Sequence, residues 1–203
     1  MIRAVSLLVC LSVPVLAGAA GIPKAAETHK STLIRAARAV WGIDAPVAVF
    51  AAQVHTESRW NANAKSPVGA EGLAQFMPAT AAWLPSVAPE TGKPAPYNPG
   101  WSLRALVTYD RWIWDQVRAS NDYERMAFTL SAYNGGLGWV NRDKRLAVRK
   151  GLDPSRWFGH VETVNAGRSA ANFRENRNYP RLILIERQRV YEAAGWGKGL
   201  HND

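Results

Sequence analysis

A single carboxylate, Glu57, is the strongest candidate for chemistry in this sequence. It lies where a run of apolar residues at helical spacing ends, and a loop of small and polar residues follows it. A lone acid at the mouth of a cleft, with amide and hydroxyl groups returning toward it, suits general acid/base work on a neutral polymer. It does not suit metal binding, which needs several ligands. We therefore expect no metal and no cofactor.

The helix that we expect to carry Glu57 begins near Asp44, which can cap it, with Pro46 in the first turn. Its apolar positions recur every three or four residues: Val47, Phe50, Ala51 and Val54. The same period places Glu57 on or beside the buried face at the helix C-terminus. Burial and the negative end of the helix dipole both disfavour the ionised form, so we expect the pKa of Glu57 to be raised.

The rest of the chain is typical of a mainly α domain. Helical periodicity predicts further helices at residues 31–41, 78–84, 102–117, 123–133, 137–150 and 175–194. An irregular excursion with five prolines spans residues 85–100. No alternating strand pattern and no internal repeat is found, so we expect one helical domain over residues 20–203.

The first 19 residues are typical of a secretory signal peptide. Arg3 gives the positive start, the apolar centre spans Leu7 to Leu16, and Ala17-Gly18-Ala19 offers a cleavage site. That apolar centre is too short for a membrane span of about 20 residues. The only cysteine, Cys10, lies in this segment, so the exported chain would have no disulfide, thiolate nucleophile or Zn–Cys site. We expect the protein in the periplasm or cell wall.

The net charge of +9 and a sequence pI near 10.1 predict an acidic partner. Nucleic acid and an anionic cell wall both fit, and export favours the wall. The basic stretch from Arg142 to Lys150 is either a solvated helix face or a surface that attracts wall carboxylates.

Three segments, in this order, resemble the motifs of soluble lytic transglycosylases. Residues 57–61 (Glu-Ser-Arg-Trp-Asn), with 66–70 and 72–78, resemble the first motif block of that family. Residues 132–136 resemble its Ala-Tyr-Asn-x-Gly motif, and residues 175–179 its closing Glu-Thr-Arg-x-Tyr motif. The chain departs from the pattern at Asn176, where Thr is usual, and at Pro180.

The resemblance implies a lysozyme-like, goose-lysozyme-like helical fold with a cleft. It also implies cleavage of peptidoglycan between N-acetylmuramic acid and N-acetylglucosamine, with a 1,6-anhydro product made without water. Ordinary glycosidases use two carboxylates, whereas here the substrate's own N-acetyl oxygen can cover the developing positive charge. Glu57 would act first as the acid and then as the base.

The resemblance also implies substrate-binding residues in the first motif block: Ser66, Gln75 and Met77. Ser66 would bond the leaving oxygen or the acetamido group, or else hold the loop. Gln75 offers a donor and an acceptor to a sugar or to Glu57, or else stabilises a turn. Met77 would line a sugar subsite or simply pack.

The later motifs add Tyr133, Asn134 and Glu175. We expect Tyr133 to hydrogen-bond Glu57 and orient it, with a buried core tyrosine as the alternative. Asn134 would contact sugar or loop. Glu175 would support the site around the tyrosine without touching the substrate, or else cap the N-terminus of a helix. His55 points to another face of its helix than Glu57, which predicts a structural or surface histidine.

Three other functions compete with a lytic transglycosylase. A goose-type lysozyme would hydrolyse the same bond with water. A wall-binding protein could keep the fold without catalysis, although the intact motif residues oppose this. A nucleic-acid binder is suggested by charge alone. We expect a monomer acting on glycan strands and not on nucleic acid, in wall remodelling, in a secretion or conjugation machine, or in a phage assembly.

Overall fold

Helices form almost all the regular structure of residues 21–202, the part of the chain that the computed structural model describes. The expected signal peptide, residues 1–19, lies outside that part. The α-helices are α1 (Lys24–Trp41), α2 (Val47–Ser58), α3 (Pro78–Trp83), α4 (Pro99–Gln116), α5 (Asp122–Gly135), α6 (Leu137–Arg149), α7 (Ala170–Arg181) and α8 (Gln188–Ala193). Short 3₁₀ turns cover Leu84–Ser86, Pro89–Thr91 and Val161–Thr163, and a π-helical segment covers Leu182–Arg187. The expected mainly α fold is confirmed.

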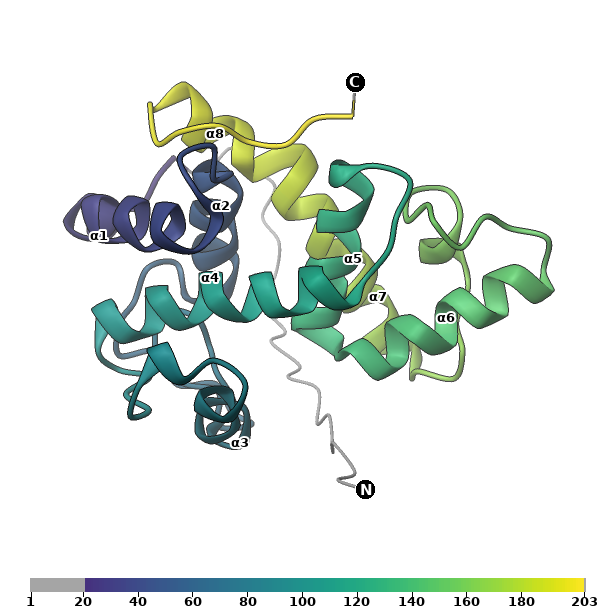
Figure 1. Cartoon of the computed structure of the whole chain (residues 1–203), viewed down its shortest axis with the longest axis horizontal. Helices are drawn as coiled ribbons and strands as arrows, with labels where there is room; N and C mark the ends of the chain where they lie inside the picture. Colours follow the sequence, from purple (N-terminus) through teal and green to yellow (C-terminus); the bar gives the residue numbers. More distant parts are fainter. Residues whose placement is uncertain (1–20, 203) are drawn as a thin grey trace.

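The helices lie at opposite ends of the molecule, with α5 and α7 between them (Figure 1). Figure 1 shows α1, α2 and α4 together on one side, α6 at the opposite end, and α5 with α7 between them. Two isolated bridges, Lys65 to Glu71 and Glu71 to Phe76, are the only β pairing in the described residues. They shape the loop that follows Glu57.

Helix α2 is buried on all sides rather than along one stripe. Every residue from Val47 to His55 is buried, because α1, α8 and the π-helical segment pack around it. The expected cap by Asp44 is wrong: Pro46 occupies the cap position, and the exposed Asp44 pairs with Lys198 instead. Asp44 lies too far before the first turn for its carboxylate to reach the free N–H groups there.

Other helix starts also differ from expectation. Helix α1 begins at Lys24, seven residues before the expected start at residue 31. Helix α4 begins at Pro99 instead of residue 102, because the side chain of Asn98 accepts a hydrogen bond from the N–H of Trp101 (3.0 Å). Helix α7 begins at Ala170 rather than at residue 175, with Ser169 as its cap. Asn98 and Ser169 thus act as caps within turn-rich stretches, where helical periodicity does not mark the start of a helix.

The last helix continues through its proline. Pro180 lies near the end of α7, and the π-helical segment follows directly. A proline has no N–H to donate to the preceding turn, and π segments arise where the regular bonding of a helix is interrupted. The helical path nevertheless runs on through α8. This long element packs against α5 with its first part and against α2 with its second.

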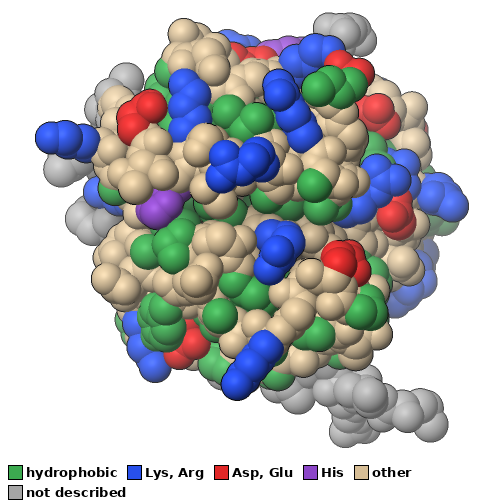
Figure 2. Space-filling view, turned by 60° about the vertical axis from the view of Figure 1, so that its left-hand side comes forward, with side chains coloured by type: hydrophobic (Ala, Val, Ile, Leu, Met, Phe, Trp, Pro, Cys, Tyr) green, Lys and Arg blue, Asp and Glu red, His purple; other side chains and the backbone are tan. Residues whose placement is uncertain are grey.

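The surface carries more basic than acidic side chains. Figure 2 shows Lys and Arg spread over the visible face, with fewer Asp and Glu among them. On α6 the basic side chains Arg142, Arg145 and Arg149 are exposed, as expected for a solvated face. None of the helices within residues 21–202 has the length and apolarity needed to cross a membrane.

Candidate active site

Glu57 lies in the last turn of α2, partly buried, directly before a sharp change of chain direction. Burial, opposed by the hydrogen bond from Tyr179 and assisted by the nearby Glu175 carboxyl, raises the pKa of the Glu57 carboxyl to about 8. The expected direction is thus confirmed, with burial as the main cause. A carboxyl of this kind holds its proton at neutral pH and can give it to a leaving group.

The backbone after Glu57 is held in an uncommon conformation. Arg59 and Trp60 both have positive φ angles, 52° and 65°, although neither is glycine. Trp60 is buried, and its indole N–H donates to the hydroxyl of Tyr191 (2.7 Å). That hydroxyl also lies 3.1 Å from Nδ1 of His55, whose pKa burial lowers to about 4. His55 is therefore a structural histidine, as predicted, and anchors the turn that aims Glu57.

The hydroxyl that contacts Glu57 belongs to Tyr179 of α7. It donates a short hydrogen bond to Oε1 of Glu57, and the ring is almost fully buried. The prediction that Tyr133 makes this bond is wrong, because the Tyr133 hydroxyl donates to the carbonyl oxygen of Ala74 (2.7 Å). Burial, and after it the charge of Glu57, raise the pKa of Tyr133, so Tyr133 lies within electrostatic range of Glu57. Tyr179 is the last residue of the third motif, and this position was the sequence feature that could have identified it as the donor to Glu57.

Ser66 stabilises the loop, which is the second of the two roles considered for it. Its hydroxyl oxygen accepts a hydrogen bond from the N–H of Ala70 (2.9 Å), while the Ser66 N–H donates to the Ala70 carbonyl (2.9 Å). The hydroxyl thus receives a backbone donor and keeps its own proton to offer.

Gln75 stabilises the same loop with its amide group. Its Nε2 donates to the carbonyl oxygens of Ala64 (3.2 Å) and Gly72 (2.9 Å). Both amide hydrogens are therefore used, and the side-chain oxygen is what remains for a ligand. Met77 is partly exposed at the cap position of α3, the first residue beyond this loop.

Gly72 is a position where the site tolerates no side chain. Its φ is +74°, and a Cβ built there would lie 1.8 Å from the carbonyl oxygen of Pro96. The proline-rich excursion thus lies directly against the motif loop. Only glycine allows both this backbone angle and this approach.

Asn134 and Glu175 are joined across α5 and α7. The Asn134 Nδ2 donates to Oε1 of Glu175 (3.4 Å), and its Oδ1 accepts from the Nδ2 of Asn176 (3.0 Å). Burial raises the pKa of Glu175. Glu175 lies inside α7, so the helix-cap alternative is wrong. Asn176 stands where the family pattern has Thr, and its bond with Asn134 links the second and third motifs. Asn176 also accepts from the Ser131 hydroxyl (2.9 Å).

A buried ionic cluster lies behind these residues, and the sequence interpretation missed it. Asp143 of α6 accepts from Arg177 of α7 (2.8 Å) and from Arg168, and all three side chains are buried. The available signal was the spacing of Asp143 with Val140 and Ala147 on the apolar face of α6. An acid on that face needs buried partners. The cluster fixes α7, and with it Tyr179, to α6.

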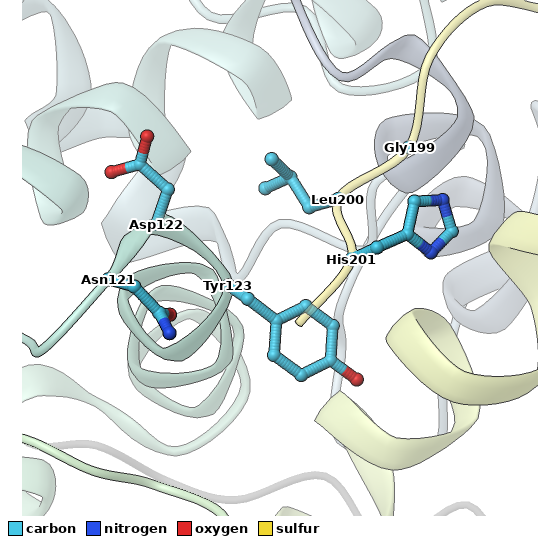
Figure 3. Close-up of a pocket in the computed structure, with 6 residues that line it drawn as sticks. All are labelled: Asn121, Asp122, Tyr123, Gly199, Leu200 and His201. Carbon is cyan, nitrogen blue, oxygen red and sulfur yellow. The ribbon is translucent and has the colours of Figure 1, made fainter. Parts of the chain in front are cut away.

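A separate pocket lies away from Glu57. It has a volume of about 590 Å³ and lies between the start of α5 and the C-terminal residues Gly199, Leu200 and His201 (Figure 3). None of the site residues described above lines it. Within residues 21–202, no group of three or more His, Cys, Asp or Glu side chains is arranged to hold a metal ion.

The chain is similar in sequence to curated bacterial proteins. The chain is 35% identical over 155 residues to membrane-bound lytic murein transglycosylase F of Shewanella halifaxensis, covering 76% of this chain and 27% of that protein. The corresponding protein of Vibrio vulnificus is 33% identical over 130 residues, 64% of this chain and 23% of its own length. The chain thus spans about a quarter of the length of these curated relatives.

Solved structures and a family model agree with this. The 70 kDa soluble lytic transglycosylase of Escherichia coli matches with a TM-score of 0.57 and 25% identity, over 82% of this chain and 24% of that one. A complex of the 70-kDa soluble lytic transglycosylase with bulgecin A matches with a TM-score of 0.56 and 26% identity, over 83% and 25%. The family model described as "Transglycosylase SLT domain" matches residues 32–154, more than half of the chain. The protein therefore belongs to the transglycosylase SLT domain family.

Proposed function

We propose that this protein is a peptidoglycan lytic transglycosylase in which Glu57 is the catalytic acid and base. The observation that carries the proposal is one partly buried carboxyl, with a pKa raised to about 8, held by the hydroxyl of Tyr179. The names of the relatives, lytic murein transglycosylases, support the same substrate. Peptidoglycan glycan strands are then the partner.

In the first step, protonated Glu57 gives its proton to the glycosidic oxygen between N-acetylmuramic acid and N-acetylglucosamine. The C1–O bond breaks, and the N-acetyl oxygen of the muramoyl sugar covers the positive charge at C1. In the second step, the Glu57 carboxylate takes the proton of the C6 hydroxyl while that oxygen bonds to C1. The product is the 1,6-anhydro sugar, and Glu57 is again protonated. Acid/base help of this kind is worth roughly 10²–10⁴ in rate.

Tyr179 serves both steps. Its O–H donates to one oxygen of Glu57 and leaves the other for the substrate. When Glu57 becomes a carboxylate, this bond strengthens because its acceptor is then charged. Glu175 is the second acid nearby, but its bond with Asn134 and its raised pKa suit a supporting role rather than that of a nucleophile.

Substrate contacts follow from the groups that the loop leaves available: Ser66 offers its hydroxyl proton and Gln75 its side-chain oxygen. Met77 and Asn134 are the further substrate contacts that we propose. A row of partly buried rings extends from Tyr133: Tyr109, Trp112 and Trp83, with neighbouring ring centres 5.4, 6.0 and 5.0 Å apart. Flat aromatic faces of this kind suit the apolar faces of sugars.

The setting that we propose is the exported, wall-facing side of the cell, with the chain acting as a monomer. The exposed basic side chains of α6 would attract wall carboxylates, which predicts binding to isolated sacculi that weakens as salt rises. A secretion, conjugation or phage assembly could supply further targeting.

The test is digestion of purified sacculi by the wild type, Glu57→Gln and the exposed control Glu90→Gln. We expect the wild type and the control to release products one water lighter than hydrolysed muropeptides, and Glu57→Gln to fold but release almost none. Products at the hydrolysed mass would instead identify a goose-type muramidase. Near-normal turnover by Glu57→Gln would refute the role of Glu57.

A further inference from the structure

A second carboxyl, Asp110, lies in the core behind Glu57. Asp110 belongs to α4 and is fully buried, as is Gln53 of α2, which lies one helical turn before Glu57. The Gln53 Nε2 donates to Oδ1 of Asp110 (3.3 Å). This bond ties the helix that carries Glu57 to α4.

The pair has two acceptor atoms without a partner. Oε1 of Gln53 and Oδ2 of Asp110 are both buried, and neither has a hydrogen bond. An ionised carboxylate only accepts, so it cannot satisfy the Gln53 oxygen. A protonated carboxyl carries one O–H donor, which is the group that the pair lacks. Buried polar groups are usually hydrogen-bonded, and the carboxyl proton of Asp110 would give the Gln53 oxygen its missing donor.

The groups that face Asp110 also favour its neutral form. The titratable side chains coupled to its charge are Glu57 on α2, Tyr109 on α4, Tyr133 on α5 and Tyr179 on α7. Each of them is an acid, so a negative Asp110 would oppose every proton loss around it. Burial is the largest effect on the pKa of Asp110. The hydrogen bond from Gln53 lowers this pKa, but burial and the charge of Glu57 together raise it well above its usual range.

We propose that Asp110 is a positioning residue for Glu57: it stays protonated at neutral pH and donates its proton to Gln53. The resulting acid–amide pair, with two hydrogen bonds, anchors the last turns of α2 on α4. Because the pair is uncharged, it supports Glu57 without a second fixed negative charge beside it. The catalytic part of this inference rests on the proposed function of Glu57, whereas the protonation of Asp110 does not.

The protonation is tested on the folded wild-type chain by carbon NMR of its labelled aspartate carboxyls. We expect the Asp110 signal to keep the position of a carboxylic acid from pH 4 to pH 8, with Asp110→Asn identifying the signal. The exposed Asp115 is the matched control residue. An Asp110 signal at the carboxylate position at pH 7 would overturn the inference, whatever the activity of the enzyme.

The positioning role is tested by variants. Asparagine has nearly the shape of the neutral acid and can still donate to Gln53, so Asp110→Asn should keep both the turnover and the pH profile of the wild type. Asp110→Ala leaves the Gln53 amide unpaired and should lower kcat, so activity is rescued only by the asparagine. If Asp110 were ionised, Asp110→Asn would remove a like charge and move the alkaline limb of the profile down by about one pH unit, which would refute the proposal. Should Glu57→Gln prove fully active, the proposed function fails, and the NMR result still decides the protonation of Asp110.

Discussion

Replacing Glu57 by glutamine should make the protein more stable, and increasingly so as the pH rises. The folded state holds the pKa of Glu57 near 8, against 4.5 for the free side chain. The unfolded chain therefore gives up this proton at lower pH than the folded chain does. Stability linked to Glu57 is complete below about pH 4.5 and is lost as the pH rises through 8. Glutamine copies the protonated form and has no proton to lose.

The size of the effect follows from the two pKa values. Each unit of difference corresponds to about 1.4 kcal/mol. Between pH 4.5 and pH 7 the wild type should lose about 3 kcal/mol relative to the glutamine variant, and over the whole window to above pH 8 about 5 kcal/mol. Such a loss is a large part of the stability of a typical domain.

Urea unfolding of both proteins at pH 4.5, 6, 7 and 8 measures this difference directly. The exposed Glu90→Gln variant controls for the loss of one negative charge. A gap between wild type and Glu57→Gln that stays constant from pH 4.5 to pH 8 would refute the reasoning. It would mean that the site does not hold the proton of Glu57.

Three further changes test the site. Tyr179→Phe removes the hydroxyl that donates to Glu57, so turnover should fall about tenfold. The alkaline limb of the pH profile should also move up, since this bond lowers the pKa of Glu57. An unchanged profile would show that the bond is absent in solution. Gly72→Ala forces a side chain against Pro96 in a left-handed conformation and should destabilise the fold by more than about 1 kcal/mol in thermal unfolding. Gly69→Ala is the control, because Gly69 also has a positive φ but nothing lies near its Cβ position, and equal midpoints of the two variants would contradict the close approach. Arg177→Met leaves Asp143 buried with one partner fewer and should cost about 3 kcal/mol in urea unfolding, whereas a neutral result would mean that Arg168 alone compensates the charge.

Helical periodicity and the motif order were enough to predict the fold class and the place of Glu57 at a helix end. Helix starts were less predictable, because Asn98 and Ser169 act as caps within stretches that are rich in turn residues. Local patterns carry no information about which of several polar residues a distant segment will approach.

The contacts of the site show the same limit. The raised pKa of Glu57 follows from its position on a buried helix, which the sequence reveals. The choice between Tyr133 and Tyr179 as its donor depends on how α5 and α7 pack, and both residues occupy motif positions. Asp110 and Gln53 lie outside every motif, so only the three-dimensional packing brings them beneath Glu57.

The helical stretch from α7 to α8 determines how far the chain can be shortened without losing the contacts of Glu57 and Trp60. The family model matches only residues 32–154. Two hydroxyls beyond that stretch bond to the end of α2 and the turn after it: Tyr179 donates to Glu57, and Tyr191 accepts from Trp60. A fragment trimmed at residue 154 would retain Glu57 and most motif residues but would lose the Tyr179 hydroxyl that hydrogen-bonds Glu57. Any shortened version of this protein should therefore end beyond Trp196, whose ring packs on both Trp60 and Tyr191.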